Sequence, residues 1–343
     1  MSGSDNTYTH GRRRYIVAMC VAIFIAVACA ILALICGSVQ IPVQGVLDIL
    51  GGGTPEKATW GHIVLDLRLP AVATAAIAGT SLAVAGLLMQ TIFANPLAGP
   101  SIMGVSSGAG LGVAIMVLLL GTSGGAVVSG AILGAMAVVA ILVMLSGILR
   151  SGVMLLIVGI LLSYLSSSAI TLMNFAATEQ SVHTYVLWGM GTFSDTAWSQ
   201  LPIPAITAAA MLIVAFMSAK GLNAMLMGER YAANMGVHVQ RLRTTTLLCA
   251  GILTAVTTAY CGPIAFIGLA VPHMARLAMG TSNHKRLLPM TAVCGAATAL
   301  LTLWLCTLPS RWGSMPVNAI TPLIGVPVII YIIINRRRIA YFN

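Results

Sequence analysis

The residue types that carry out catalysis or bind metals are scarce in this chain and do not cluster. Its 343 residues include seven Asp and Glu, six His and seven Cys. The cysteines are odd in number, form no CxxC pair and lie mostly in apolar runs, which is typical of small buried hydrophobic residues rather than of a metal site or a disulfide framework. His273, close to Arg276, is more readily explained by packing or by capping of a helix end than by ligand binding. We therefore expect no metal site and no catalytic residue.

The sequence also lacks an energy source of its own. It contains no GxxxxGK[ST] phosphate loop and no polar stretch long enough to fold as an ATPase domain. All seven carboxylates lie outside the apolar segments, whereas ion-driven carriers usually keep ionisable groups near the membrane midplane. If the chain moves a solute uphill, the energy has to come from another chain.

The composition is that of a membrane protein. Apolar residues make up 59% of the chain and charged residues only 7%, and the mean hydropathy is +0.99. So few charged side chains cannot form a water-soluble surface. The composition excludes a soluble enzyme, a disordered protein and a nucleic-acid-binding protein, although the net charge is +10.

Ten uncharged, largely apolar segments follow one another along the chain. Such solid runs predict membrane-spanning helices, because the strands of a β-barrel would alternate apolar and polar residues over about ten positions. Glycines at four-residue spacing, Gly104, Gly108 and Gly112 and later Gly130 and Gly134, indicate faces where helix backbones approach closely. The ten segments are 15–36, 69–92, 97–120, 125–149, 152–175, 201–219, 244–260, 264–275, 288–308 and 319–334.

The basic residues indicate how these segments are oriented. With the N-terminus inside and all ten segments crossing, 14 of the 17 Lys and Arg lie on the internal side and five of the seven acidic residues lie outside. Segment 264–275 has only 12 residues, but without its crossing the basic run 336–338 would lie on the wrong side. We predict an all-α polytopic membrane protein with ten transmembrane helices and both termini cytoplasmic. It would comprise a tail 1–14, a ten-helix domain 15–335 and a tail 336–343.

The longest internal loop, 220–243, is the place where a partner chain would attach. Its sequence GLNAMLMGERYAANMGVHVQRLR spaces apolar residues three to five positions apart and has breaks at Gly228 and Gly236, which predicts two short helices. An ordinary basic loop held at lipid headgroups is the alternative.

Six stretches of the chain together resemble the FecCD-type permeases, the transmembrane subunits of bacterial ATP-binding-cassette (ABC) importers for iron-siderophores, haem and cobalamin. They are Arg68-Leu69-Pro70, GTSLAVAGLLMQTIFANPLAGPSIMGVSSGAGLG, GERYAANMGVHVQRLR, CGPIAFIGLAVPHMARL, HKRLLP and MPVNAITPLIGVP. The resemblance extends over residues 15–338. It implies a multi-pass protein of the bacterial cytoplasmic (inner) membrane that imports an iron chelate, haem or cobalamin.

The resemblance also implies the partners. The chain would form a homodimer in the membrane lipid, bind a cytoplasmic ABC ATPase dimer and receive its substrate from an external substrate-binding protein. ATP and Mg would bind to the partner ATPase, so no cofactor and no nucleic acid is expected on this chain. An ion-coupled secondary transporter that acts without an ATPase partner is the alternative, and a membrane scaffold without transport is a third possibility.

The resemblance assigns residues to the contact with the ATPase and to a cytoplasmic gate. Gly228 would allow a sharp turn, and Glu229 would offer its carboxylate to backbone N–H groups at a helix start or act as a solvated cap. The gate would combine the turn at Asn95, which Asn-Pro also favours for local reasons, with the start of the fifth helix. The coupling residues are Gly228, Glu229, Arg230, Ala232 and Gly236, and the gate residues are Asn95, Leu97, Gly152 and Val153.

Two further sets follow from the same resemblance. Hydroxyl groups of the fifth helix would line the pathway, unless they bond to carbonyl groups of their own helix. Two arginines would dock the binding protein, unless each only anchors its helix. The pathway residues are Ser163, Ser166, Ser167, Ser168 and Thr171, and the docking residues are Arg68 and Arg311. The chain departs from the family pattern at Ala71, where a second arginine is usual, at Leu303 and Thr307, where Asp and Arg are usual, and at Asn318, where Gly is common.

Overall fold

The computed structural model describes residues 2–53, 56–149, 151–308 and 314–335. Within these ranges all regular structure is helical, in fifteen α-helices and two π-helical turns. Seven helices of the described ranges are long and apolar enough to cross a membrane. One is the continuous helix Ala58–Ile92, made of α3 (Ala58–His62), the turn η1 (Ile63–Arg68) and α4 (Leu69–Ile92). The others are α1 (Ser2–Ile35), α6 (Gly125–Ile148), α7 (Gly152–Ala176), α12 (Val239–Cys261), α14 (His284–Thr307) and α15 (Val317–Ile334).

Three more apolar elements are broken or shorter. α9 (Pro202–Met217) and α10 (Ala219–Met225) bend by 54° at their junction and together have the length of a span. α5 (Val105–Ala114) continues into the turn η2 (Ile115–Leu119), and α13 (Ile267–Met279) is the other short helix. The remaining helices are α2 (Val43–Leu50), α8 (Glu179–Gly189) and α11 (Glu229–Asn234).

Each predicted segment contains a helix, although the helix bounds differ from the segment bounds by several residues in places. In the segment 97–120 the helix begins only at Val105. The preceding residues form turns, and Gly104 before the helix has a φ of +76°, a left-handed conformation that glycine adopts without strain. The short helices α2, α3 and α8 lie outside the predicted segments.

α4 lies in the core of the bundle, where most of its residues are buried. It packs against α12, α13 and α14, and the closest approaches occur at glycines. A Cβ atom on Gly86 would overlap the carbonyl oxygen of Gly268 in α13, and one on Gly79 would overlap that of Gly295 in α14. The predicted glycine faces are used for close approach, here between α5 and α6, because a Cβ atom on Gly112 would overlap the carbonyl oxygen of Gly130.

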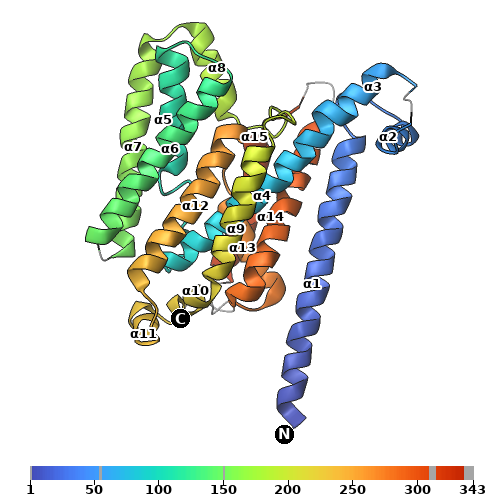
Figure 1. Cartoon of the computed structure of the whole chain (residues 1–343). Helices are drawn as coiled ribbons and strands as arrows, with labels where there is room; N and C mark the ends of the chain where they lie inside the picture. The colour runs from blue at the N-terminus through green and yellow to red at the C-terminus, as the bar shows by residue number, and fades with distance from the viewer. Residues whose placement is uncertain (1, 54–55, 150, 309–313, 336–343) are drawn as a thin grey trace.

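The helices divide into a central group and two flanks (Figure 1). α5, α6, α7 and α8 pack together on one flank, and α1 packs against α14 on the other. The N-terminal end of α1 lies on the side of the bundle that carries α10 and α11 (Figure 1). The same side carries the loop that was expected to receive a partner.

Candidate functional site

The loop 220–243 forms two short helices, as predicted. α10 ends at Met225 and α11 begins at Glu229, and Gly228, directly before α11, has a φ of +104°. Gly236 follows α11 with a φ of +83°. Both are left-handed conformations in which a side chain would strain the backbone, so glycine is required at both breaks. Figure 1 shows α10 and α11 together at one end of the bundle.

The pair α10 and α11 exposes three large side chains that are mainly apolar. Met227, Tyr231 and Met235 are 69%, 47% and 64% exposed. Ala232, on the inner side of α11, is fully buried, and Arg230 is exposed. An exposed apolar group on an otherwise charged loop is typical of a protein contact surface.

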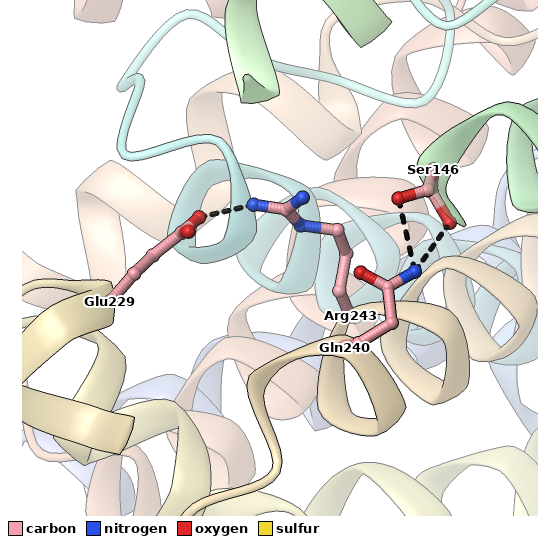
Figure 2. A network of polar contacts seen from close by, with 4 residues as sticks. All are labelled: Ser146, Glu229, Gln240 and Arg243. Atoms are coloured by element: carbon pink, nitrogen blue, oxygen red, sulfur yellow. Dashed lines mark hydrogen bonds and ion pairs between the residues drawn. The ribbon is translucent and has the colours of Figure 1, made fainter. Parts of the chain in front are cut away.

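Glu229 joins α11 to α12. Its carboxylate accepts a charge-assisted hydrogen bond from Nη2 of Arg243, whose side chain is almost fully buried (Figure 2). Among the described residues, the Glu229 carboxylate accepts this bond from Arg243 and none of the expected bonds from backbone N–H groups at the start of α11. A guanidinium group binds a carboxylate more strongly than neutral N–H groups do, which explains the difference.

One turn before Arg243, Gln240 joins α12 to α6. Its Nε2 donates to the carbonyl oxygen of Ser146 at 3.0 Å, and the Ser146 hydroxyl oxygen lies 3.4 Å from the same atom (Figure 2). Ser146 lies in the last turn of α6, where carbonyl groups lack partners within the helix. The contact therefore holds the end of α6, from which the chain continues to Gly152 and α7.

α10 is joined to the end of α4 through a buried histidine. The side-chain oxygen of Asn223 accepts the backbone N–H of His284 at 2.8 Å and lies 2.9 Å from its Nδ1. Nε2 of His284 lies 2.8 Å from the hydroxyl oxygen of Thr91, in the last turn of α4. His284 is 0% exposed, so this contact is shielded from water.

A second buried group surrounds the turn that follows α4. Nη1 of Arg276 donates to the side-chain oxygen of Gln90 at 2.6 Å, and Nε2 of Gln90 donates to the carbonyl oxygen of Leu269 at 3.1 Å. Nε2 of His273 donates to the carbonyl oxygen of Pro96 at 2.7 Å. His273 thus holds the turn in place, in agreement with the packing role that the sequence favoured.

The two predicted gate segments meet in the structure. The side chain of Asn95 accepts the backbone N–H of Leu97 at 2.9 Å, which closes the turn locally. A Cβ atom on Gly152 would lie 3.3 Å from Cδ1 of Phe93, so the start of α7 touches this turn. Leu97 and Val153 are both exposed on the single chain. Their role as a gate stays a prediction.

The hydroxyl groups of α7 are arranged in two ways. Those of Ser163 and Thr171 donate to the carbonyl oxygens of Gly159 and Ser167 in their own helix, at 3.0 and 2.9 Å. Ser166 is buried, whereas Ser167, Ser168 and Thr171 are exposed. The same helix exposes a series of large apolar side chains, among them Leu161, Tyr164, Leu165, Leu172 and Phe175.

Arg68 has acceptors within the chain. Nη1 donates to the carbonyl oxygens of Leu34 and Ile35 at 2.6 and 2.9 Å, and Nη2 donates to that of Val39 at 2.5 Å. Leu34 and Ile35 end α1, so the guanidinium group caps the negative end of that helix. Arg311 lies outside the described residues.

Asn318, a departure from the family pattern, joins three segments. Its side-chain oxygen accepts the N–H of Ala265 at 3.2 Å, and its Nδ2 donates to the carbonyl oxygens of Pro263 and Gly189 at 2.6 and 3.3 Å. It holds the segment before α13, where Phe266 has a left-handed φ of 67°.

Sequence reasoning missed the polar residues that join these elements, namely Thr91, Asn223, Gln240 and His284. Thr91, Gln240 and His284 lie within stretches that resemble the family, but nothing in the sequence indicated that they join these elements. Among the described residues, no three His, Cys, Asp or Glu side chains come together as a metal site.

Comparison with known proteins agrees with this architecture. A model of the FecCD transport family matches residues 23–335. The chain is 33% identical over 292 residues to the hemin transport system permease protein HmuU of Yersinia pestis, which covers 82% of this chain and 86% of HmuU. It is 32% identical over 279 residues to the vitamin B12 import system permease protein BtuC of Vibrio cholerae, which covers 80% and 84% of the two chains. A solved structure described as an inward-facing conformation of a metal-chelate type ABC transporter has a TM-score of 0.82 and 28% identity, over 92% of this chain and 98% of that one.

Proposed function

Because the chain belongs to the FecCD transport family and is a multi-span membrane permease of the ABC-importer class, we propose that it forms the membrane pathway for an iron chelate, haem or cobalamin. The relatives named for hemin and vitamin B12 support this substrate class. The observation that carries the proposal is the pair α10 and α11, a two-helix element with exposed apolar side chains in a chain that has no phosphate loop.

The chain crosses the membrane ten times, with both termini in the cytoplasm. The seven long helices, the bent pair α9–α10 and the two shorter apolar helices make ten candidate crossings. The N-terminal end of α1 lies on the side that carries α10 and α11 (Figure 1), and ten crossings would return the chain to that side. The excess of Lys and Arg in the loops on that side supports a cytoplasmic assignment.

The partner ATPase docks on α10 and α11. Met227, Tyr231 and Met235 would enter its surface, and full burial of side chains of this size contributes about 1.5–3 kcal/mol each. The coupling residues Gly228, Glu229, Arg230, Ala232 and Gly236 shape this element, and ATP and Mg bind only to the partner.

A second copy of the chain covers the exposed face of α7. The large apolar side chains of that face would be buried in a homodimer, and Ser167, Ser168 and Thr171 would lie along the pathway between the two copies. The segments at Asn95, Leu97, Gly152 and Val153 close its cytoplasmic end. An external binding protein delivers the substrate to the opposite side.

Reconstitution of the complete complex in vesicles tests the proposal. The chain is purified with the ATPase and the binding protein, and uptake of haemin, vitamin B12 and a ferric hydroxamate siderophore is measured with and without ATP. We expect uptake of one of the three that requires ATP, the ATPase and the binding protein. Uptake without the ATPase that follows a proton or sodium gradient would instead establish the ion-coupled alternative.

A further inference from the structure

The predicted gate has two walls, the turn at residues 93–97 and the start of α7. The polar contact from α10 reaches the first of them. Asn223 in α10 holds His284, and His284 holds Thr91. Thr91 lies two residues before Phe93 and four before Asn95, in the last turn of α4. The polar contact between α10 and this wall therefore runs through a single buried side chain, that of His284.

The polar contact from α11 reaches the second wall. Glu229 in α11 binds Arg243, and Gln240 of the same helix binds the carbonyl group of Ser146 (Figure 2). α6 ends two residues after Ser146, and α7 begins at Gly152. Each of the two short helices is thus joined to a different wall, and the walls meet at Phe93 and Gly152.

The atoms of the first contact define the direction of each hydrogen bond. The side-chain oxygen of Asn223 already accepts the backbone N–H of His284, so it is an acceptor and Nδ1 of the ring must donate. In the neutral ring Nε2 is then an acceptor, and the hydroxyl group of Thr91 donates to it. The same hydroxyl group also lies 2.9 Å from the carbonyl oxygen of Leu87.

Thr91 therefore has two acceptors for one proton. When His284 moves away, the hydroxyl group can donate to Leu87 instead, so that no buried polar group of α4 is left unsatisfied. A hydrogen bond with two discrete arrangements can couple a movement of α10 to a movement of the end of α4, and the reverse. A purely apolar contact has no such defined pair of arrangements.

We propose that His284–Thr91 and Gln240–Ser146 are positioning contacts that transmit movements of α10 and α11 separately to the two walls of the gate. The inference rests on the proposed function, because it takes α10 and α11 as the ATPase-docking element and 93–97 and the start of α7 as the gate. Neither contact touches substrate or nucleotide.

Distances between the two copies of each wall measure the transmission directly. The complete complex is prepared with the seven native cysteines replaced, and each copy of the chain carries one spin label, at Leu97→Cys or at Val153→Cys. The distance between the labels of the two copies is recorded with and without ATP. We expect an ATP-dependent shift at both positions in the otherwise unmodified complex. Thr91→Val removes the hydroxyl group at nearly constant volume and should abolish the shift at 97 while that at 153 remains.

Gln240→Met should give the reverse pattern, with the shift at 153 lost and that at 97 kept. Thr91→Ser retains the hydroxyl group and should behave as the parent. The matched controls are Thr302→Val, at a buried threonine whose hydroxyl group donates within its own helix at 2.9 Å, and Gln180→Met, at an exposed position in α8.

A functional readout accompanies the distances. The quantity measured is the amount of substrate imported per ATP hydrolysed, with the probe that the parent complex imports. It should fall about fivefold or more in Thr91→Val and in Gln240→Met, because fivefold is the low end of measured couplings between two sites. If Thr91→Val does not assemble, His284→Asn replaces it, because the shorter side chain retains a group near Asn223 and does not reach Thr91.

The proposal is overturned if Thr91→Val and Gln240→Met leave the ATP-dependent shifts at positions 97 and 153 unchanged. It is also overturned if one of these variants loses the shifts at both positions equally. Equal losses in the control variants also overturn it, since the effect would then be general. Failure of the proposed function would be seen in the parent complex itself. That complex would then bind no ATPase, give no measurable distance between spin labels on two copies, or show no ATP-dependent uptake.

Discussion

Gly152 and Phe93 are in contact, since a Cβ atom on Gly152 would lie 3.3 Å from Cδ1 of the phenyl ring. The two residues belong to α7 and to the turn after α4, which are far apart in sequence. The distance is short for a Cβ contact, yet a small movement of the ring accommodates one methyl group. Larger side chains would force the two segments apart.

Gly152→Ala should therefore transport at close to the normal rate, whereas Gly152→Leu should separate the segments and open the cytoplasmic end of the pathway. The measurement is passive release of imported probe from vesicles after ATP is removed, which we expect to be faster in the leucine variant. Gly147→Leu is the matched control, because nothing lies within 4 Å of a Cβ atom at that position in α6. Equal release from both leucine variants would rule out a gate at Gly152.

Replacement of Glu229 tests the link between α11 and α12. Glu229→Arg places a positive charge against the buried Arg243 and should abolish uptake while the protein still inserts and folds. Glu229→Gln keeps a hydrogen-bond acceptor, and because Glu229 is about half exposed its loss of charge should cost about 1 kcal/mol or less. Uptake and protein content of the same vesicles are compared, with Glu179→Arg, an exposed site on α8, as the control. Normal ATP-dependent uptake by Glu229→Arg would contradict this assignment.

Arg68 distinguishes an anchor from a docking residue. Its three bonds to carbonyl oxygens predict that Arg68→Ala lowers stability by about 1.5–3 kcal/mol, the usual worth of a hydrogen bond to a charged group. Arg68→Lys should also be destabilised, because an ammonium group does not reproduce the planar fork of the guanidinium group. Thermal unfolding in detergent measures this effect, and Lys57→Ala is the control at an exposed cation.

The docking alternative gives a different pattern for the same variants. A free positive charge at Arg68 would speed association with the binding protein in a manner that falls as salt is raised, and Arg68→Lys would retain it. Association rates of Arg68→Ala and Arg68→Lys at low and high salt separate the two roles.

Gly86→Ala should destabilise the bundle. The added methyl group would overlap the carbonyl oxygen of Gly268, and both atoms belong to helices in the core, so neither backbone can yield without disturbing further contacts. We expect a stability loss of at least about 1–3 kcal/mol, seen as a lower yield of monodisperse protein and a lower unfolding temperature. Gly189→Ala, with nothing within 4 Å of its Cβ position, should leave both values unchanged.

The sequence by itself determined the features that depend on neighbouring residues. Long uncharged runs can satisfy their backbone groups in a membrane only as helices, so the helical class and the positions of the apolar segments could be predicted. Gly228 and Gly236 broke the loop 220–243 into two helices because only glycine adopts the left-handed conformation there without strain. Glycines four residues apart likewise indicated faces of close helix approach, although the structure alone shows that α5 meets α6 there.

Only the tertiary structure decided which polar groups meet. Thr91 and His284 are 193 positions apart, and Arg68 finds its acceptors 29 to 34 positions away at the end of another helix. No periodicity indicates such pairs, since a buried donor takes whichever acceptor the packing of several helices brings within reach. For the same reason Glu229 binds Arg243 across two helices rather than its own helix start, and the residues that join α10 and α11 to the turn after α4 and the end of α6 became visible only in the folded chain.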